Sequence, residues 1–467
     1  MQRALRFREG FLFKGGKKME KKLSFFQIVA IGFMLFAMFL GAGNVIFAPV
    51  LGQQAGTNTP IAMAGFLVTG VGLVLLAIIA LTKGGGTVEK LASRVSPKFA
   101  VIFSVLLFLT LGPIYVIPRT TSVVYEIAIK QLITDNSMIG LFLLVFSIIF
   151  IALTVYLSWE TTKFVDRLGK LITPVFATLL VIIVAKSIFT PMGSVHGPVD
   201  GMGYETASDA FLKGFTQGYF TMDVLAAFVF GGIFIKSIDA LGIRSKKEVS
   251  KVFIKAGLVT VVGLVLLQVS MSWIGATSVD AVGYTTNGGE LIALASQALF
   301  GQIGIYLIGI VILLTGITTN VACLAAVAEY FERIIPKVSY KKWLIIFSLG
   351  SLIITNFGLT KILTMASPIL MLLYPIAIAL IILIFTDSWF KGSRAVYVGT
   401  IIGVSIVAIM DALKDANIAV ETLNNVFGFI PLFSNGAGWI VTGLIGAIIG
   451  FFFKKEKQEE TGELREA

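Results

Sequence analysis

The sequence predicts an all-α polytopic membrane protein with about 12 transmembrane helices. Of its 467 residues, 57% are hydrophobic and 13% are charged, whereas a soluble domain carries about 25% charged residues. Apolar runs such as 138–157 reach the roughly 20 residues that a membrane-spanning helix needs. These runs do not show the alternating polarity of barrel strands. The chain therefore has the composition of a helical protein whose surrounding solvent is a lipid bilayer.

The expected spans follow the apolar runs in chain order. We expect them at about 25–51, 60–82, 99–125, 138–157, 165–189, 211–236, 251–276, 303–332, 342–358, 362–386, 395–411 and 433–453. The segments on one side of these spans hold 31 of the 37 Lys and Arg residues, the opposite segments hold 5, and Arg119 lies inside the third span. Basic segments stay in the cytoplasm. We therefore expect a cytoplasmic N-terminal segment (1–22) and a cytoplasmic tail (454–467).

The few chemically reactive side chains argue against an enzyme. Cys323 is the one cysteine and lies in an apolar run, and His196 is the one histidine and lies in a predicted external loop. One cysteine forms no intrachain disulfide and no thiolate metal site, and we find no nucleophile–base pair or phosphate loop. We expect no cofactor, no nucleic-acid partner and no obligate protein partner. The loop 281–302 is expected to carry a short surface helix.

Span one contains a cluster of helix-breaking residues at mid-membrane depth. Gly41, Gly43, Asn44 and Pro49 all fall within the stretch 39–49, and each glycine costs a helix about 1 kcal/mol relative to alanine. Unwound backbone at that depth is tolerated only where it lines a cavity or is buried in protein. The free N–H groups of the following half-helix can hold a carboxylate. The alternative is a packing face of small residues.

Span six contains a second interruption, Gly218 to Asp223. An acid inside an apolar segment is costly and is a functional candidate by default, although Asp223 could instead cap a half-helix. Paired interruptions in corresponding halves indicate a transporter site. Because breaks in spans one and six give repeats of five spans each, an odd number, the second repeat must be inverted relative to the first. The sequence thus predicts a first repeat (23–190), a second repeat (205–388) and two extra helices (389–453).

Four motifs carry a family resemblance over about residues 22–454. They are the stretches 41–49 (GAGNVIFAP), 111–115 (LGPIY), 166–174 (DRLGKLITP) and 218–223 (GYFTMD). Together they resemble the bacterial branched-chain amino acid:cation symporter family, which belongs to the amino acid–polyamine–organocation superfamily. The resemblance implies a LeuT-like 5+5 inverted-repeat fold in the bacterial inner membrane. It also implies sodium-coupled import of leucine, isoleucine or valine by alternating access, in which spans 1, 2, 6 and 7 rock against spans 3, 4, 8 and 9.

The resemblance also implies a sodium site. The stretch 315–322 in span eight is similar to the span-eight stretch of sodium-coupled LeuT-like carriers. By this match the ligands are the hydroxyls of Thr318 and Thr319 and the carbonyls of Ala37, Leu40 and Thr315. Sodium would be a coupling ion and not a cofactor. The alternative for the two hydroxyls is back-bonding to carbonyls of their own helix.

The substrate site implied by the resemblance lies between the two breaks. N–H groups in the Ala42, Gly43 and Asn44 region would hold the α-carboxylate, and the carbonyls of Phe220 and Thr221 would accept from the ammonium. Asp223 could bond the amine, assist the cation or cap the half-helix. The apolar pocket would be lined by Leu111, Tyr115, Phe220 and Ala226.

Three other transport mechanisms are alternatives to sodium coupling. Proton coupling could use a lysine on span five, for which Lys170 is the candidate, although a lysine there also fits an interfacial position. A twelve-span facilitator with two parallel halves is disfavoured by the inverted pairing of the breaks, and a channel would need a filter motif or an oligomeric pore. The sequence specifies neither a preference among the three amino acids nor the stoichiometry nor the oligomeric state.

Overall fold

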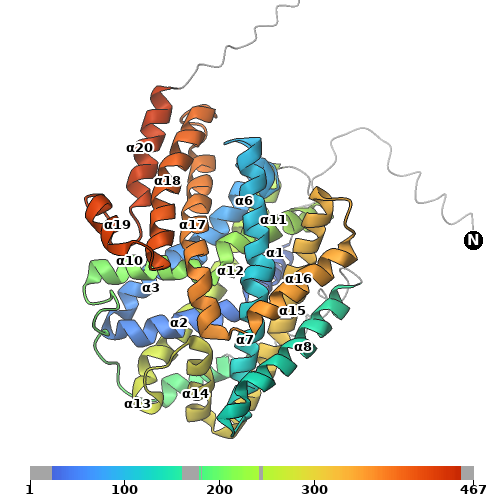
Figure 1. Ribbon diagram of the computed structural model, residues 1–467, viewed down its shortest axis with the longest axis vertical. Coiled ribbons are helices and arrows are strands. Elements are labelled where there is room, and N and C mark those ends of the chain that lie inside the picture. The colour runs from blue at the N-terminus through green and yellow to red at the C-terminus, as the bar shows by residue number, and fades with distance from the viewer. Residues whose placement is uncertain (1–23, 160–177, 180, 241–245, 454–467) are drawn as a thin grey trace, which may run out of the picture.

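A computed structural model describes residues 24–159, 178–179, 181–240 and 246–453. Over these residues the chain is helical and contains no strand (Figure 1). The helices are α1 (Phe25–Phe39), α2 (Ala42–Ala55), α3 (Thr59–Leu67), α4 (Leu73–Gly84), α5 (Val88–Ala92), α6 (Pro97–Leu109), α7 (Val116–Ala128), α8 (Ile139–Ser158), α10 (Ala207–Gln217), α11 (Asp223–Ala240), α12 (Lys246–Thr277), α13 (Val279–Val282), α14 (Gly288–Phe300), α15 (Gln302–Ile334), α16 (Tyr340–Thr355), α17 (Leu359–Thr386), α18 (Arg394–Asp415), α19 (Val420–Phe427) and α20 (Trp439–Phe452).

The outer surface of the bundle is apolar. Seven helical segments among the described residues are long and apolar enough to cross a membrane. On α8, Leu141, Ile148 and Ile149 are exposed, while Ser147 and Thr154 on the opposite face are buried. A face of this kind needs lipid as its solvent. The predicted class, an all-α polytopic membrane protein, is confirmed, and the number of twelve spans stays a prediction.

Both predicted interruptions are present. Span one divides into α1 and α2 at Leu40 and Gly41. Span six divides into α10 and α11 around the 3-10 turn Gly218–Thr221, after which Met222 adopts a left-handed conformation with φ of 68°. The ring of Phe47 on α2 lies 5.6 Å from that of Phe220 in the turn. The two breaks therefore lie side by side.

Two further irregularities were not predicted. Spans two and three each contain a π-helical turn, at Val68–Gly72 and Thr110–Ile114. In the second turn Gly112 has non-helical angles, φ of −99° and ψ of −115°. A Cβ atom there would lie 2.8 Å from Cγ2 of Val327 on α15, so the absence of a side chain allows α15 to approach. Such turns often occur at functional sites.

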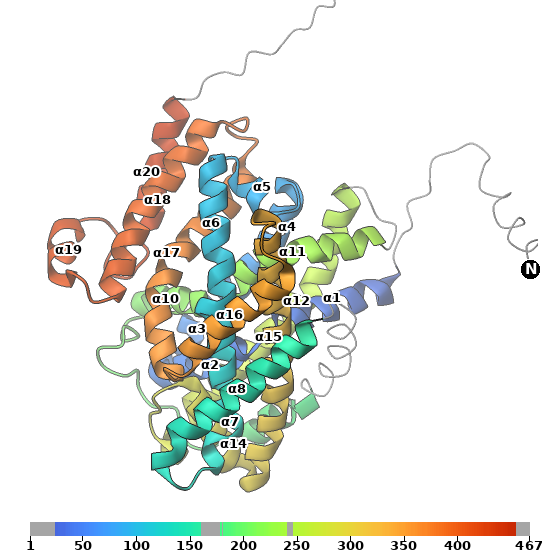
Figure 2. The same ribbon diagram turned by 45° about the vertical axis from the view of Figure 1, so that its right-hand side comes forward.

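Helices α17, α18 and α20 form a layer at one side of the bundle, orange to red in Figures 1 and 2. Helices α18 and α20 pack against each other, and α18 also packs against α17. A Cβ atom on Gly399 or Gly446 would overlap the backbone of the facing helix. The small residues therefore allow α18 and α20 to pack in close contact.

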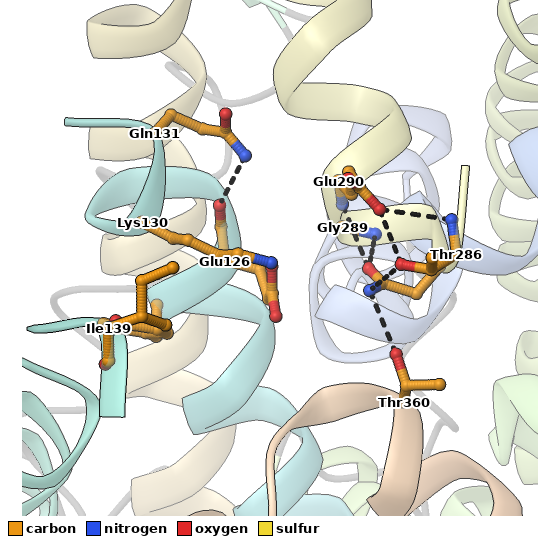
Figure 3. A network of polar contacts seen from close by, with 10 residues as sticks. Glu126, Lys130, Gln131, Ile139, Thr286, Gly289, Glu290 and Thr360 are labelled. Atoms are coloured by element: carbon orange, nitrogen blue, oxygen red, sulfur yellow. Dashed lines mark hydrogen bonds and ion pairs between the residues drawn. The ribbon is translucent and has the colours of Figure 1, made fainter. Parts of the chain in front are cut away.

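Helix α14 corrects the expectation of a surface helix in 281–302. Leu291, Ala293 and Ala295 are buried, and α14 packs against α2, α7 and α15. Its N-terminus joins the polar network of Figure 3, opposite the ion pair between Glu126 and Lys130, whose Oε2 and Nζ atoms lie 2.8 Å apart. The helix is thus part of the interior packing.

Asn287 caps α14, and its loss is expected to destabilise the protein. Its Oδ1 accepts from the N–H groups of Gly289 and Glu290, both at 3.0 Å, and its Nδ2 donates to Oγ1 of Thr360 at 3.3 Å. Removal of an N-cap costs about 0.5–2 kcal/mol. We expect Asn287→Ala to lower the unfolding temperature in detergent, whereas Asn425→Ala on the exposed face of α19 leaves it unchanged. Equal unfolding temperatures for the two variants would contradict the capping role.

Helices α3 and α10 pack with their backbones in contact, which gives a second stability prediction. A Cβ atom on Gly214 would overlap the carbonyl of Ala62, whereas one on Gly140 in α8 has no described atom within 4 Å. Overpacking typically costs about 1–3 kcal/mol. We expect Gly214→Ala to lower the unfolding temperature and Gly140→Ala to leave it unchanged or raise it, as measured by differential scanning fluorimetry. A stable Gly214→Ala variant would show that the two helices can separate without cost.

The loop that contains His196 is fastened to α13. His196 Nε2 lies 2.6 Å from Oδ1 of Asp280, and the N–H of Ser194 donates to Oδ2 of Asp280 at 2.8 Å. Hydrogen bonds lower the pKa of the Asp280 carboxyl below its usual value, and the bond from the Ser194 N–H has a larger effect than the bond from the His196 side chain. The carbonyl of His196 also accepts from the N–H of Thr57 at 2.9 Å. The histidine is therefore a structural contact of the loop.

Candidate functional site

The break in span one frees carbonyl oxygens at the end of α1. The N–H of Gly41 donates to the carbonyl of Phe39 at 2.9 Å, and the N–H of Asn44 donates to that of Gly41 at 3.1 Å. In a continuous helix these two N–H groups would donate four residues back, to the carbonyls of Ala37 and Leu40. The carbonyl of Leu40, one of the two predicted backbone ligands for a cation, therefore loses its helical partner at the break.

The Asn44 side chain holds the break in shape. Its Nδ2 donates to the carbonyl of Phe39, and its Oδ1 accepts from Nε2 of Gln268 on α12 at 2.5 Å. The Asn44 N–H already donates a hydrogen bond. The N–H groups of Ala42 and Gly43 are therefore the donors at the start of α2 that have no acceptor within the helix. Among the residues that the structure describes, no side chain caps this helix. Its positive end suits an anion.

Helix α15 brings its threonines to the same break. Oγ1 of Thr319 lies 3.9 Å from where a Cβ atom on Gly41 would be. The hydroxyls of Thr318 and Thr319 donate to the carbonyl of Thr315 at 2.9 and 3.0 Å. The back-bonding alternative is therefore the observed arrangement, in which each hydroxyl oxygen keeps lone pairs for another partner.

The second break presents a buried acid. Asp223 is the first residue of α11 and is 4% exposed, and its Oδ2 has no hydrogen-bond partner in the described part of the chain. Helix α17 supports this turn, because the ring of Tyr374 stacks on that of Tyr219 with centroids 4.6 Å apart. The carboxylate is thus held between the half-helices without a complete set of donors.

Arg119 on α7 joins the two breaks, although its position in the sequence indicated only a charge inside span three. Its side chain is buried, and Nη1 donates to the carbonyl of Phe220 at 2.8 Å. Its Nη2 would lie 2.9 Å from a Cβ atom on Gly43. A single charge in the middle of an apolar span is the feature that could have identified it. The carbonyl predicted to receive the substrate ammonium already accepts from this guanidinium.

Aromatic rings surround the Arg119 guanidinium. Its carbon lies 4.7 Å from the ring centroid of Tyr115 and 5.6 Å from that of Phe47. The structure thus brings Tyr115 and Phe220 to the breaks. Leu111 lies buried in the π-helical turn of span three, and Ala226 lies half-buried in the first turns of α11. The candidate Lys170 falls outside the described residues.

Comparison with known proteins decides the family. Residues 24–457 match the model of a family described as branched-chain amino acid transport protein. The chain belongs to this family. Within the branched-chain amino acid transport family, the chain is 40% identical to the branched-chain amino acid permease BrnQ of Bacillus subtilis over 93% of this chain and 98% of the relative. It is 36% identical to the branched-chain amino acid transport system 2 carrier protein of Pseudomonas aeruginosa, over 91% of this chain and 95% of that relative.

Solved structures confirm the LeuT-like fold for this family member. The inward-facing conformation of Mhp1 matches with a TM-score of 0.58 at 16% identity, over 91% of this chain and 90% of that one. MhsT, solved in complex with L-phenylalanine, matches with a TM-score of 0.54 at 15% identity, over 94% of this chain and 99% of that one. The family model and the curated relatives, which are named as transport proteins and permeases, identify this family member as a multi-pass membrane transporter and not an enzyme. No cluster of three or more His, Cys, Asp or Glu residues in its described ranges could hold a metal ion.

Proposed function

We propose that this transporter is a symporter that imports leucine, isoleucine or valine together with sodium. The substrate class rests on the relatives, which are named branched-chain amino acid permeases and carriers. Sodium as the coupling ion rests on the break in span one, where the carbonyl of Leu40 loses its helical partner and the hydroxyl of Thr319 lies beside Gly41. That arrangement of neutral oxygens is the observation that carries the proposal.

Sodium would bind where the end of α1 meets α15. Its ligands would be the carbonyls of Ala37, Leu40 and Thr315, with the hydroxyls of Thr318 and Thr319. For the Thr315 carbonyl to bind sodium as well, the hydroxyl protons of Thr318 and Thr319 would turn away from it, because a carbonyl oxygen has two lone pairs. Entry of one charge down 100 mV supplies about 2.3 kcal/mol, and a tenfold sodium gradient adds about 1.4 kcal/mol. Together they support roughly 500-fold accumulation of a neutral solute.

The amino acid would lie between the two half-helices. The N–H groups of Ala42 and Gly43 would bind its carboxylate, and Asp223 with the carbonyl of Thr221 would bind its ammonium. Phe220, Tyr115, Leu111 and Ala226 would surround the aliphatic side chain. Binding of both solutes between breaks in opposite repeats, 23–190 and 205–388, suits alternating access. We also propose the bacterial inner membrane as the location, with both termini in the cytoplasm.

Proton coupling is the second candidate, and Asp223 favours it. This carboxylate is buried, and one of its oxygens has no partner within the described ranges. Buried intramembrane acids commonly carry protons in transporters. In that case Asp223 would take up a proton from the outside and release it to the inside. This proton movement, and not sodium entry, would drive transport.

The test is uptake of radiolabelled leucine into proteoliposomes. An inward sodium gradient at equal pH should drive accumulation, and replacement of sodium by choline should abolish it. Uptake that needs an acid outside and ignores sodium would assign proton coupling instead. Absence of uptake of leucine, isoleucine and valine under both gradients would remove the proposed substrates and leave the fold unaffected.

A further inference from the structure

The Arg119 guanidinium has fewer partners than its burial requires. The residue is 3% exposed, and a guanidinium carries five N–H donors. Nη1 donates to the carbonyl of Phe220, whereas Nε has no partner among residues 24–159, 178–179, 181–240 and 246–453. A buried charge left incompletely paired strongly destabilises the folded protein. The guanidinium is therefore arranged to receive another hydrogen-bond acceptor.

The start of α2 adds a second positive group at the same place. Nη2 of Arg119 lies 2.9 Å from the position of a Cβ atom on Gly43, beside the first N–H groups of α2, which no described side chain caps. A helix N-terminus carries a partial positive charge, so it repels a neighbouring guanidinium. An anion that contacts both groups would offset this repulsion, and glycine at position 43 is what lets the guanidinium come so close to the start of α2.

Asp223 supplies the opposite charge across the site. Its buried side chain interacts electrostatically with Arg119, and its Oδ2 lacks a partner in the described part of the molecule. Arg119 and Asp223 thus each keep one buried polar atom, Nε and Oδ2, without a partner in the described ranges. A zwitterion satisfies both, because its carboxylate meets the arginine and its ammonium meets the aspartate.

We propose that Arg119 binds the α-carboxylate of the transported amino acid, together with the N–H groups of Ala42 and Gly43. The role rests on the proposed function only in that the ligand is an amino acid. The carbonyl of Phe220 can keep its bond to Nη1 and still accept from the ammonium, because a carbonyl oxygen has two lone pairs. Arg119 thus makes the site prefer ligands with a free carboxylate over amines and amides of the same shape.

Calorimetric titration of the purified full-length protein in sodium buffer tests this role. The ligands are L-leucine and L-leucinamide, which differ in the carboxylate. The wild type should prefer leucine by about 100-fold, because charge-assisted hydrogen bonds to a buried arginine are strong. In Arg119→Gln the preference should fall to within a few-fold, with leucinamide binding retained. Arg119→Lys should be intermediate, because lysine lacks the planar fork.

Two further variants separate a ligand from a structural residue. Gly43→Ala places a methyl group against Nη2 and should weaken leucine binding more than leucinamide binding. Arg94→Gln, which removes a guanidinium that pairs with Asp387 at 2.9 Å, should keep the wild-type preference. Size-exclusion profiles and unfolding temperatures identify any variant that fails to fold. If Arg119→Gln fails to fold, the ligand preferences of Arg119→Lys and Gly43→Ala provide the test instead.

The outcomes distinguish this inference from the proposed function. Equal weakening of both ligands in Arg119→Gln would make Arg119 a structural residue, and unchanged or tighter leucine binding would remove it from the site. If the wild type binds a different amino acid and discriminates against its amide through Arg119, the proposed substrate is wrong and the inference stands. If the folded wild type binds none of the twenty amino acids, both are overturned.

Discussion

Asp223→Asn is expected to lower leucine uptake by about 30-fold or more, because truncation of a buried charged partner typically costs about 2–5 kcal/mol. The substitution keeps the size of the side chain and its contacts with Thr221 and Asn44. It removes the negative charge opposite Arg119 that the ammonium would meet. The measurement is the initial rate of radiolabelled leucine uptake into proteoliposomes at several leucine concentrations.

A second assay on the same variant separates the two possible roles of Asp223. Exchange of internal for external leucine needs the substrate to bind but needs no net movement of a proton. Loss of both net uptake and exchange would identify the ammonium ligand, whereas loss of net uptake alone would identify a proton carrier. Asp280→Asn in the His196 loop is the matched control and should retain both activities. Full activity of Asp223→Asn would exclude both roles.

Replacement of Thr318 and Thr319 by valine should remove most of the response to sodium. Valine has the shape of threonine but offers no oxygen, so two of the five proposed neutral ligands are lost. Hydrogen bonds and ligand contacts of this kind are worth about 1–2 kcal/mol each, which predicts a rise of about 30-fold or more in the sodium concentration for half-maximal uptake. The sodium dependence of leucine uptake is the quantity to measure.

Thr154→Val on α8 is the control for the valine pair. Its hydroxyl also back-bonds within a helix, to the carbonyl of Phe150 at 2.8 Å, but lies on another helix that neither break includes. We expect its sodium dependence to match the wild type. If the double variant also keeps the wild-type sodium dependence, the cation binds elsewhere or a proton drives transport.

The broken helices were predictable because their causes are local. Glycine weakens a helix wherever it stands, and Gly41 and Gly43 adjoin Asn44, whose amide can satisfy freed backbone groups. Asp223 could be recognised for a similar reason, since a charge in an apolar run must face the interior. In both cases the residue type itself carries the information.

The remaining features depend on which segments meet in space. Arg119 was visible as a charge inside span three, but its contact with Gly43 and Phe220 comes from α2, α7 and the turn of span six packing together. The π-helical turn Val68–Gly72 contains ordinary apolar and small residues, so its sequence does not distinguish it from α-helix. For α14, the spacing of apolar residues indicates a helix, but only the positions of α2, α7 and α15 decide that it is buried.

The break in span one places two proposed binding sites of opposite charge on adjacent peptide units. The carbonyl of Leu40 closes the end of α1 and the N–H of Ala42 opens α2, with Gly41 alone between them. A cation on one side and a carboxylate on the other would attract each other and fix the same few backbone torsions. Thermodynamic linkage then requires reciprocity: whatever factor sodium adds to leucine affinity, leucine must add to sodium affinity. Co-transport of sodium and leucine would then follow from the fact that only one residue, Gly41, separates α1 from α2.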